Sequence, residues 1–290
     1  MSWQRTVGVA VSRSGATDAI GESVVRGIEL AIEDLQETGD SAVTARIDDT
    51  GGDPERAAEV AESQIDDGCP VVVGPISSDV ALGVREVAER RQVPLLPAVG
   101  GNPEVTEPGT RYTFRYAGNN SQNARGTLEF FREVGVDRMA VVGADFSYPR
   151  AVARHLREYA PEYGLEVGPV EHTPLGTTDF SDQLAAIDPE RVDGIFLPYP
   201  GNNATTLLQQ LQETGLFGEC VVVGDYSFGS IPYQRRLERS MADTHNWGID
   251  TVGPRYRELA ARLDGPAGVY HMLGYDIGRI AGEALAAVED

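Results

Sequence analysis

The sequence predicts an α/β protein in which two doubly wound, Rossmann-like parallel sheets form two lobes joined by a hinge. Short apolar runs alternate regularly with amphipathic stretches, and some runs, such as VVVG at 71–74 and at 221–224, are apolar at consecutive positions. Parallel strands whose two faces are both covered by helices have this pattern. The length of 290 residues also suits two domains of roughly 150 residues each.

The first part of the chain predicts a repeat of strands and helices. Amphipathic segments at 21–37, 53–67 and 77–91 carry apolar residues at helical spacing, as Val24 and Ile28 do in the first of them. Strands are expected around these helices at 6–11, 43–48, 70–75, 93–99 and 112–116. This order is typical of a doubly wound sheet.

The same alternation begins again after residue 120. Helices are expected at 121–134, 148–160, 179–187, 203–214 and 230–240. Strands are expected at 138–143, 165–172, 194–199 and 220–225. A second lobe of the same architecture therefore follows the first.

Two polar tracts, AGNNSQ at 117–122 and ADTHNWGIDT at 242–251, are interpreted as crossovers between the lobes. Two more helices are expected after the second crossover, at 254–263 and 267–289. The predicted lobes are therefore 1–117 plus 250–290 for the N-terminal lobe and 118–249 for the C-terminal lobe.

The charge of the chain excludes several functions. There are 45 acidic and 24 basic residues, the net charge is −21, and every basic residue is an arginine. A P-loop and a Schiff-base enzyme both need a lysine. A strongly negative surface also repels nucleic acid and anionic membranes, so the expected partner is a small molecule.

The excess of carboxylates suggests adaptation to high salt, as in a halophile. Carboxylates keep a surface hydrated and self-repelling where molar salt reduces the Debye length to about 3 Å. A codon bias towards arginine is the alternative, but it explains the missing lysine and not the carboxylate excess.

Cysteine and histidine give no sign of a metal or redox centre. Cys69 and Cys220 each precede a strand-like run and are expected to be buried free thiols. The four histidines have no ligand spacing, so neither a metal nor a cofactor is expected. No secretory signal segment and no membrane-spanning apolar run is visible in this chain.

The loops that follow the strands are the expected place for a ligand, because ligands of open α/β sheets bind at the carboxyl ends of the strands. In GPISSDVA, Ser77 and Ser78 lie between a strand and the start of a helix. Hydroxyls and N–H groups at the positive end of a helix form a cradle for a small anion. The alternative is that a serine only caps the helix.

The other loops at this edge carry aromatic and acidic side chains, among them Tyr148, Tyr199 and Asp225. Ser227 lies in GDYSFG, which lacks the G-x-S-x-G register of a hydrolase elbow. No dinucleotide fingerprint follows the first strand. The residues therefore favour a binding protein over an enzyme.

These residues resemble the type I periplasmic binding proteins, specifically the branched-chain amino acid receptors of ABC transporters. The resemblance covers nearly the whole chain. The matching tracts are GESVVRGIELAIEDL, DDTGGDPERAAEVAESQIDDGCPVVVGPISS, VPLLPAVGGNPEVTEPGTRYTFR, FSDQLAAI and VYHMLGYDIGRIAGEAL. The segment 48–115 is the most specific, because it reproduces the order and spacing of the family's turns.

The resemblance implies an extracytoplasmic receptor whose two lobes close on an amino acid-like zwitterion and present it to a membrane permease. The first lobe would hold the carboxylate through Ser77, Ser78 and the turn formed by Val99, Gly100 and Gly101. The second lobe would hold the ammonium group through Asp225, with Tyr148 and Tyr199 covering the ligand. Such receptors have no catalytic residues and no cofactor.

Departures from the family leave the ligand open. Gly101 stands near where the family usually has a threonine, and Asp225 is shorter than the more familiar glutamate. Asp225 could instead cap a helix, Tyr148 could cover the seam between the lobes, and Tyr199 could be a turn aromatic. Arg115 is expected to form a structural ion pair. A regulatory sensor of the same fold that binds an amide or another small molecule is the alternative function.

Overall fold

The computed structural model describes residues 5–38, 43–106, 109–200, 203–225, 228, 244–246, 254–263 and 268–288. The chain divides into two compact units. Unit 1 comprises Met1–Gly118 and Val252–Asp290, and unit 2 comprises Asn119–Thr251. Each unit is a parallel sheet with helices on both faces, which confirms the predicted doubly wound α/β class.

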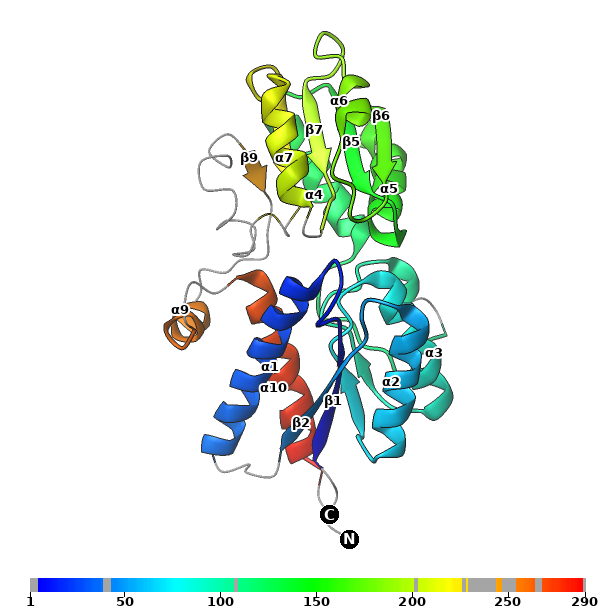
Figure 1. Cartoon of the computed structure of the whole chain (residues 1–290), viewed down its shortest axis with the longest axis vertical. Coiled ribbons are helices and arrows are strands. Elements are labelled where there is room, and N and C mark those ends of the chain that lie inside the picture. The colour runs from blue at the N-terminus through cyan, green and yellow to red at the C-terminus, as the bar shows by residue number, and fades with distance from the viewer. Residues whose placement is uncertain are drawn as a thin grey trace. The chain divides into compact units, whose positions relative to one another are not determined.

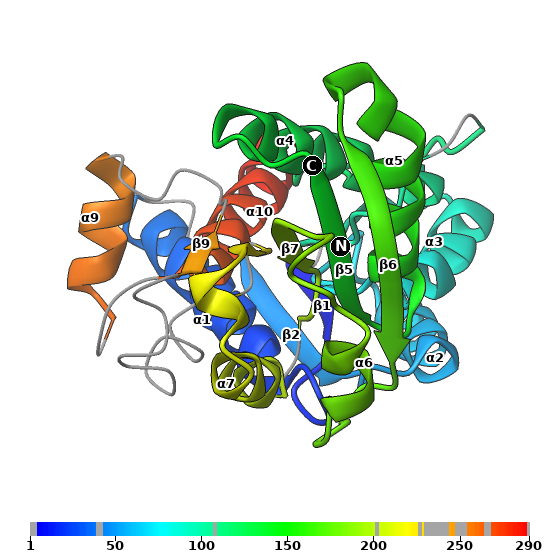
Figure 2. The same ribbon diagram turned by 90° about the horizontal axis from the view of Figure 1, so that it is seen from above.

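Unit 1 has a four-stranded parallel sheet in the order β2-β1-β3-β4 within its described residues. Its strands are β1 (Thr6–Val11), β2 (Thr44–Asp49), β3 (Val71–Val73) and β4 (Leu95–Leu96). Its helices are α1 (Asp18–Glu37), α2 (Pro54–Asp66), α3 (Ser78–Arg91), α9 (Pro254–Ala261) and α10 (Val269–Ala286), with the 3₁₀ turn η1 (Pro103–Thr106). Helices α1 and α10 lie on one face of the sheet, and α2 and α3 lie on the other (Figures 1 and 2).

Local sequence signals set the helix ends in unit 1. The Asp53 side chain accepts a hydrogen bond from the Arg56 N–H, and Pro54 follows at the first helical position of α2. The Ser77 side chain caps the start of helix α3. The helix is followed by Gln92, which adopts the left-handed conformation. These caps explain why the predicted helix bounds agree with the observed ones to within a few residues.

Helices α1 and α10 are far apart in the sequence, yet their backbones touch at glycines. A Cβ atom at Gly27 would lie 2.2 Å from the His271 carbonyl oxygen, and one at Gly274 would lie 2.2 Å from the Val24 carbonyl oxygen. Only residues without a side chain allow this approach. The C-terminal helix α10 is thereby built into the same unit as the N-terminal strand β1.

Unit 2 has a five-stranded parallel sheet in the order β6-β5-β7-β8-β9 within its described residues. Its strands are β5 (Arg138–Ala144), β6 (Glu166–Thr173), β7 (Gly194–Leu197), β8 (Val221–Gly224) and β9 (Thr244–Asn246). Its helices are α4 (Asn120–Glu133), α5 (Ser147–Tyr163), α6 (Ser181–Ala185) and α7 (Ala204–Glu213), with the 3₁₀ turn η2 (Leu216–Gly218).

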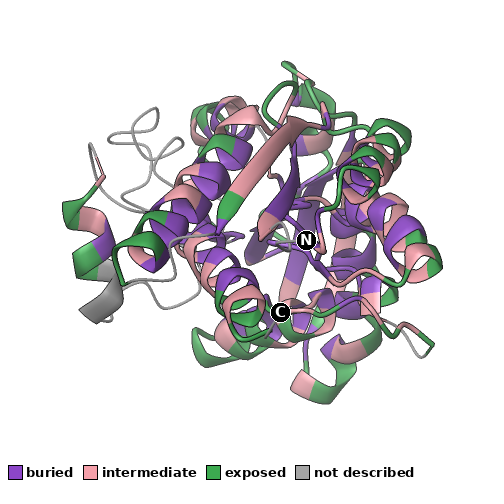
Figure 3. Cartoon of the chain, turned by 90° about the horizontal axis from the view of Figure 1, so that it is seen from below, coloured by how far each residue is buried: buried purple, intermediate pink, exposed green. Residues whose placement is uncertain are grey.

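The core of unit 2 lies on both faces of its sheet. Leu128 of α4 and Leu156 of α5 belong to one buried cluster. Leu184 of α6 and Leu208 of α7 belong to the other. Figure 3, seen from the end of the molecule that carries both termini, shows the same pattern in unit 1, with buried strands between helices whose outer faces are exposed. Consecutive apolar residues in the strands therefore fill two cores at once, as the sequence pattern predicts.

One prediction about a strand is wrong. Residues 112–116 form no strand, because they contribute only an isolated bridge between Leu95 and Thr113. The Phe114 N–H donates to the Leu95 carbonyl oxygen at 2.9 Å, whereas the N–H groups of Arg111 and Tyr112 donate to the carboxylate of Glu89, at 2.8 and 2.9 Å. The predicted crossover at 242–251 contains the strand β9, which pairs with β8. The helix predicted at 230–240 lies outside the described residues.

Both cysteines are buried free thiols, as predicted. Burial raises the pKa of Cys220 to about 11, so this thiol is protonated at neutral pH. In the part of the chain that the structure describes, no helix is both long and apolar enough to cross a membrane.

Candidate ligand-binding site

The carboxyl edge of the unit 1 sheet has its switch point between β1 and β3. After β1 the chain continues to α1 on one face of the sheet. After β3 it continues to α3 on the opposite face. Loops that diverge in this way leave a crevice at the strand ends. Ser77 and Ser78 lie in the loop that leaves β3 at this point.

The two serines have different roles. The Ser77 hydroxyl oxygen accepts a hydrogen bond from the Val80 N–H at 3.3 Å, so this side chain caps α3. The Ser78 hydroxyl is buried and accepts a hydrogen bond from the Asn102 N–H at 3.1 Å. Accepting this bond leaves the Ser78 O–H group able to donate to a ligand.

The turn that contains Val99, Gly100 and Gly101 is fixed against α3. The Val99 N–H donates to the Pro75 carbonyl oxygen at 3.3 Å. Gly100 has a φ of 62°, a left-handed conformation that favours glycine. A Cβ atom at this position would also lie 3.0 Å from the Ala81 Cβ. The structure therefore brings the predicted residues of this turn to the start of α3.

Several N–H groups at this edge lack an acceptor. Within the described residues, the N–H groups of Ser77, Ser78 and Gly100 donate to no protein oxygen. Ser78 and Gly100 are buried. A buried N–H group without a partner costs about 1–3 kcal/mol. Together with the Ser78 hydroxyl and the positive end of α3, these groups can bind a small anion such as a carboxylate.

Arg115 holds the same turn from the other side. Its Nη2 donates to the Asn102 carbonyl oxygen at 2.7 Å and its Nε donates to the Thr106 hydroxyl at 3.1 Å. Its Nη1 donates to the Gly100 carbonyl oxygen at 2.5 Å. Burial lowers the pKa of this guanidinium. Among the described residues no carboxylate lies within 4.0 Å of Arg115, so the expected ion pair is replaced by bonds to these three oxygens.

The loop after β1 is also fixed by a carboxylate. Asp49, at the end of β2, accepts hydrogen bonds from the Arg13 N–H at 2.8 Å and from the Ser14 hydroxyl at 2.7 Å. A third bond comes from the Gly51 N–H at 2.8 Å. Burial opposes ionisation, but these hydrogen bonds dominate and lower the pKa of Asp49 to about 2.

Unit 2 brings Tyr148 and Asp225 together at the carboxyl edge of its own sheet. Tyr148 follows β5 in the first turn of α5, and Asp225 directly follows β8. The Tyr148 hydroxyl donates to Oδ2 of Asp225 at 2.9 Å. The Asp225 side chain is fully buried and Tyr148 is 5% exposed. A buried carboxylate that already accepts a neutral hydrogen bond can also bind a cationic group, such as an ammonium.

Tyr199 lies elsewhere in unit 2. It is fully buried and packs edge-on against Phe180, with 5.4 Å between the ring centroids. Its hydroxyl donates to the Pro174 carbonyl oxygen at 3.1 Å. These contacts agree with the alternative of a turn aromatic, and none of them joins Tyr199 to the pair of Tyr148 and Asp225. The nearby Tyr226 and Ser227 lie outside the described residues.

The roles of Arg115 and Asp49 in fixing these loops could not be predicted from the sequence. The sequence shows only that Asp49 ends a predicted strand and that Arg115 follows the tract at 93–99 at a short distance. Neither position identifies the backbone groups that its side chain contacts. Within the described residues no cluster of three or more histidine, cysteine or carboxylate side chains could hold a metal ion.

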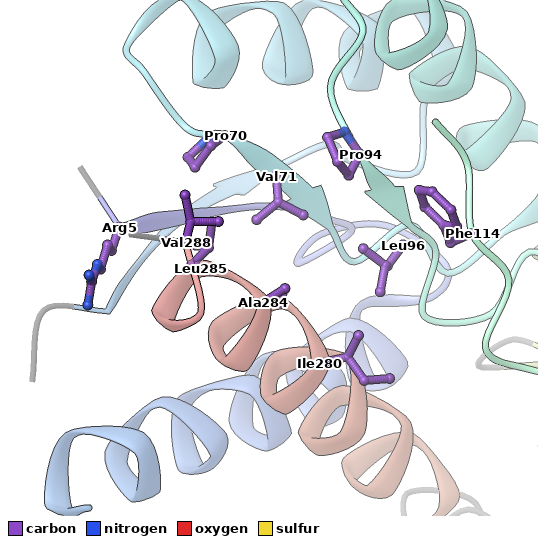
Figure 4. A pocket seen from close by; sticks show the side chains of 11 residues that line it. Arg5, Pro70, Val71, Pro94, Leu96, Phe114, Ile280, Ala284, Leu285 and Val288 are labelled. Carbon is purple, nitrogen blue, oxygen red and sulfur yellow. The ribbon is translucent and has the colours of Figure 1, made fainter. Parts of the chain in front are cut away.

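Unit 1 also has a cavity of about 500 Å³, which is apolar and lies between α10 and the sheet (Figure 4). Leu96, Phe114 and Ile280 line it at one end. Pro70 and Pro94, which precede β3 and β4, also line it, so it reaches towards the amino ends of these strands. It lacks the polar groups of the carboxyl edge and is distinct from the candidate site.

The chain thus has two doubly wound units, with N–H groups that lack a described acceptor at the strand ends of one and a buried acid at the strand ends of the other. A model of the family described as periplasmic binding protein matches residues 4–290. The chain therefore belongs to this family, among the type I proteins related to branched-chain amino acid receptors. Members of the family are solute-binding receptors and not enzymes.

Curated relatives include the Leu/Ile/Val-binding protein BraC3 of Rhizobium johnstonii. It is 25% identical over 224 residues, which cover 76% of this chain and 60% of the relative. The leucine-specific-binding protein of Salmonella typhimurium is 24% identical over 215 residues, which cover 72% of this chain and 58% of that protein. The chain thus spans about three fifths of the length of these relatives.

A solved structure with the same fold is the branched-chain amino acid transporter substrate-binding protein LivJ of Streptococcus pneumoniae, in complex with isoleucine. It has a TM-score of 0.88 at 19% identity, and the match covers 98% of this chain and 84% of LivJ. A solute-binding protein of an ABC transporter from Rhodopseudomonas palustris, in complex with 3,4-dihydroxybenzoic acid, has a TM-score of 0.85 at 21% identity. That match covers 97% of this chain and 80% of the other. The likeness to both establishes the fold.

Proposed function

We propose that the protein is the extracytoplasmic solute-binding receptor of an ABC transporter and that it binds a small amino acid or a related zwitterion. The ligand contacts residues of both units, and the protein closes on it. Membership of the periplasmic binding protein family and the likeness to Leu/Ile/Val-binding and leucine-specific-binding proteins support this role. The partner of the closed, loaded form is the membrane permease of the transporter.

The donors at the start of α3 carry the proposal. The N–H groups of Ser78 and Gly100 are buried without a protein acceptor among the described residues, and the Ser78 hydroxyl lies beside them. A carboxylate satisfies several such donors at once, and each charge-assisted bond is stronger than a neutral one. The ligand's carboxylate therefore binds at unit 1, with Ser77, Val99 and Gly101 holding the surrounding backbone.

The acid of unit 2 supplies the other end of the site. Asp225 accepts a hydrogen bond from Tyr148 and has no solvent exposure. A ligand ammonium can bind this buried carboxylate, whereas an aromatic acid such as 3,4-dihydroxybenzoate has no cationic group that could do so. This difference favours an amino acid.

Closure follows from where the charges of the ligand bind. A ligand shifts a conformational equilibrium only by its difference in affinity for the two states. A zwitterion held by Ser78 at one end and Asp225 at the other has its highest affinity when both contacts form together. Ligand binding therefore favours the closed state, which is the form that a permease distinguishes from the empty receptor.

A thermal-shift panel tests the ligand class. The panel contains the protein amino acids, their amides, benzoate and 3,4-dihydroxybenzoate, each added to the purified chain in molar KCl. We expect the largest stabilisation from an amino acid, because only a zwitterion satisfies both the donors at Ser78 and the carboxylate of Asp225. A ligand at 100 times its Kd adds about 2.7 kcal/mol to the free energy of unfolding. Stabilisation by amides alone would support the alternative of a sensor, and stabilisation by the benzoates alone would contradict the role of Asp225.

A pair of substitutions tests the ammonium contact. We expect Asp225→Asn to weaken binding of the amino acid that gives the largest shift by about 2–5 kcal/mol, measured by calorimetry. The matched control is Asp182→Asn on α6, because Asp182 is exposed and also loses one negative charge. The control should bind as the parent does. Equal affinity of Asp225→Asn and Asp182→Asn would refute the assignment.

A further inference from the structure

Arg115 contacts the turn beside the start of α3, and all of its described hydrogen-bond partners are uncharged oxygens. It donates to the carbonyl oxygens of Gly100 and Asn102 and to the hydroxyl of Thr106. Most of the described arginines that form side-chain contacts pair with a carboxylate, as Arg46 does with Asp48 at 2.9 Å. The positive charge of Arg115 is therefore not neutralised by a described neighbour.

The bond to Gly100 fixes the direction of a peptide group. In a trans peptide the carbonyl and the following N–H point to opposite sides. Because the Gly100 carbonyl is held by Arg115, the Gly101 N–H is turned away from the guanidinium. The bond also polarises this peptide group, which strengthens its N–H as a donor.

The bond to Asn102 connects Arg115 with Ser78. Arg115 holds the Asn102 carbonyl at 2.7 Å, while the Asn102 N–H donates to the Ser78 hydroxyl at 3.1 Å. This contact takes one lone pair of the hydroxyl oxygen and leaves its hydrogen to bind a ligand. Arg115 thus acts on the turn and, through Asn102, on the serine.

We propose that Arg115 is the positioning residue of the carboxylate end of the site, fixing the turn at 99–102 and giving this edge a preference for an anionic over a neutral group. The inference rests on the proposed function, because it assumes that a carboxylate binds at Ser78 and Gly100. In a chain with a net charge of −21, a partly buried positive charge behind the donors offsets the general repulsion of anions.

Acetate and acetamide are suitable probes, because they have nearly the same shape and differ in charge. Each is titrated into the ¹⁵N-labelled chain, and the amide resonances of Ser78, Gly100 and Gly101 are followed by NMR. We expect these resonances to respond to acetate and much less to acetamide. In Arg115→Met the acetate affinity should fall by at least about tenfold, because the fixed turn and the positive charge behind the donors are both lost.

Two further variants separate charge from simple loss of structure. Arg115→Lys keeps the charge without the fork of donors, so it should retain the preference for acetate over acetamide at reduced affinity. Arg111→Met is the matched control, since Arg111 is exposed and lies four residues away on the same segment. It should bind acetate as the parent does. Arg115→Lys also tests the proposal if Arg115→Met does not fold.

The outcomes distinguish this inference from the proposed function. If the parent amides do not respond to acetate, the carboxylate end of the proposed site is wrong and Arg115 has no such role. If the parent responds and Arg115→Met binds acetate equally well, the inference about Arg115 is overturned while the site stands. Equal loss of acetate binding in Arg111→Met would also overturn it, because the effect would then be one of net charge.

Discussion

His271 illustrates at the residue scale how burial and a single hydrogen bond determine a pH response. Its Nδ1 accepts a hydrogen bond from the Gly268 N–H at 3.2 Å, at the start of α10. Burial, and then the charge of Arg26, lowers the pKa of His271 from 6.5 to about 4. Between these values the unfolded chain binds a proton that the folded chain does not, so the stability falls as the pH falls through this window.

The substitution His271→Gln tests this response. Glutamine keeps an acceptor for the Gly268 N–H but does not titrate. Between about pH 7 and about pH 4 the parent should lose up to roughly 3 kcal/mol more free energy of unfolding than the variant. Urea unfolding at the two pH values measures the difference. An identical pH dependence of parent and variant would contradict the argument.

Asp49 responds in a lower pH range. Three hydrogen bonds hold its pKa at about 2, against an ordinary value of 3.8, so its contribution is complete above 3.8 and is lost as the pH falls towards 2. At neutral pH we expect Asp49→Asn to lower the free energy of unfolding by about 1–3 kcal/mol. Asp182→Asn serves as the control in the same urea titration. A change no larger than that of the control would show that Asp49 does not fix the loop.

At the scale of elements, the close contact of α1 and α10 depends on glycine. A Cβ at Gly27 would meet backbone atoms of α10, at 2.2 Å from the His271 oxygen and 2.6 Å from the Tyr275 nitrogen. Backbone atoms cannot rotate away as a side chain can, so the two helices would have to separate. The packing of α10 against α1 therefore requires a residue without a side chain at position 27.

The matched pair Gly27→Ala and Gly126→Ala tests this limit. Gly126 lies on the exposed face of α4, and a Cβ there would meet nothing within 4 Å. We expect Gly126→Ala to stabilise the protein by about 0.5–1 kcal/mol, because alanine favours the helix. Gly27→Ala should destabilise it by about 1–3 kcal/mol or more through overpacking. Thermal unfolding of both variants measures this, and a gain in stability at Gly27 would refute the contact.

Elements with their own local signals could be predicted from the sequence. The Asp53-Pro54 start of α2 and the apolar run of β3 are examples, because caps and consecutive apolar residues act within a few positions. The segment 112–116 could not, because its extent depends on side-chain contacts with Glu89, more than twenty residues earlier, which accepts bonds from the N–H groups of Arg111 and Tyr112. A short strand such as β9 also lacks the apolar run that marks a buried strand.

The candidate site was predictable to a similar extent. The positions of Ser78, Tyr148 and Asp225 follow from their places after strands, since strand ends of a parallel sheet gather at one edge. That Tyr148 donates to Asp225, and that Tyr199 instead bonds to Pro174, depends on side-chain directions set by the packed core. The sequence pattern carries no information on these directions.

At the scale of the whole molecule, the net charge of −21 predicts a dependence of stability on salt. Ion pairs such as Arg13 with Glu22 are exposed and contribute little. Salt screens the general repulsion between carboxylates, so the thermal midpoint should rise steadily from about 0.1 M to about 2 M KCl. Near pH 4, where carboxylates are partly protonated, the rise should be smaller. A flat or falling midpoint at neutral pH would contradict salt adaptation.

The central claim is that one ligand is held by its carboxylate at unit 1 and by its ammonium group at unit 2. The most direct measurement is a calorimetric titration with three compounds: the amino acid that gives the largest thermal shift, the acid that lacks its ammonium group, and the amine that lacks its carboxylate. We predict that the amino acid binds at least about a hundredfold more tightly than either analogue. Binding of the deaminated acid within about threefold of the amino acid would contradict the account.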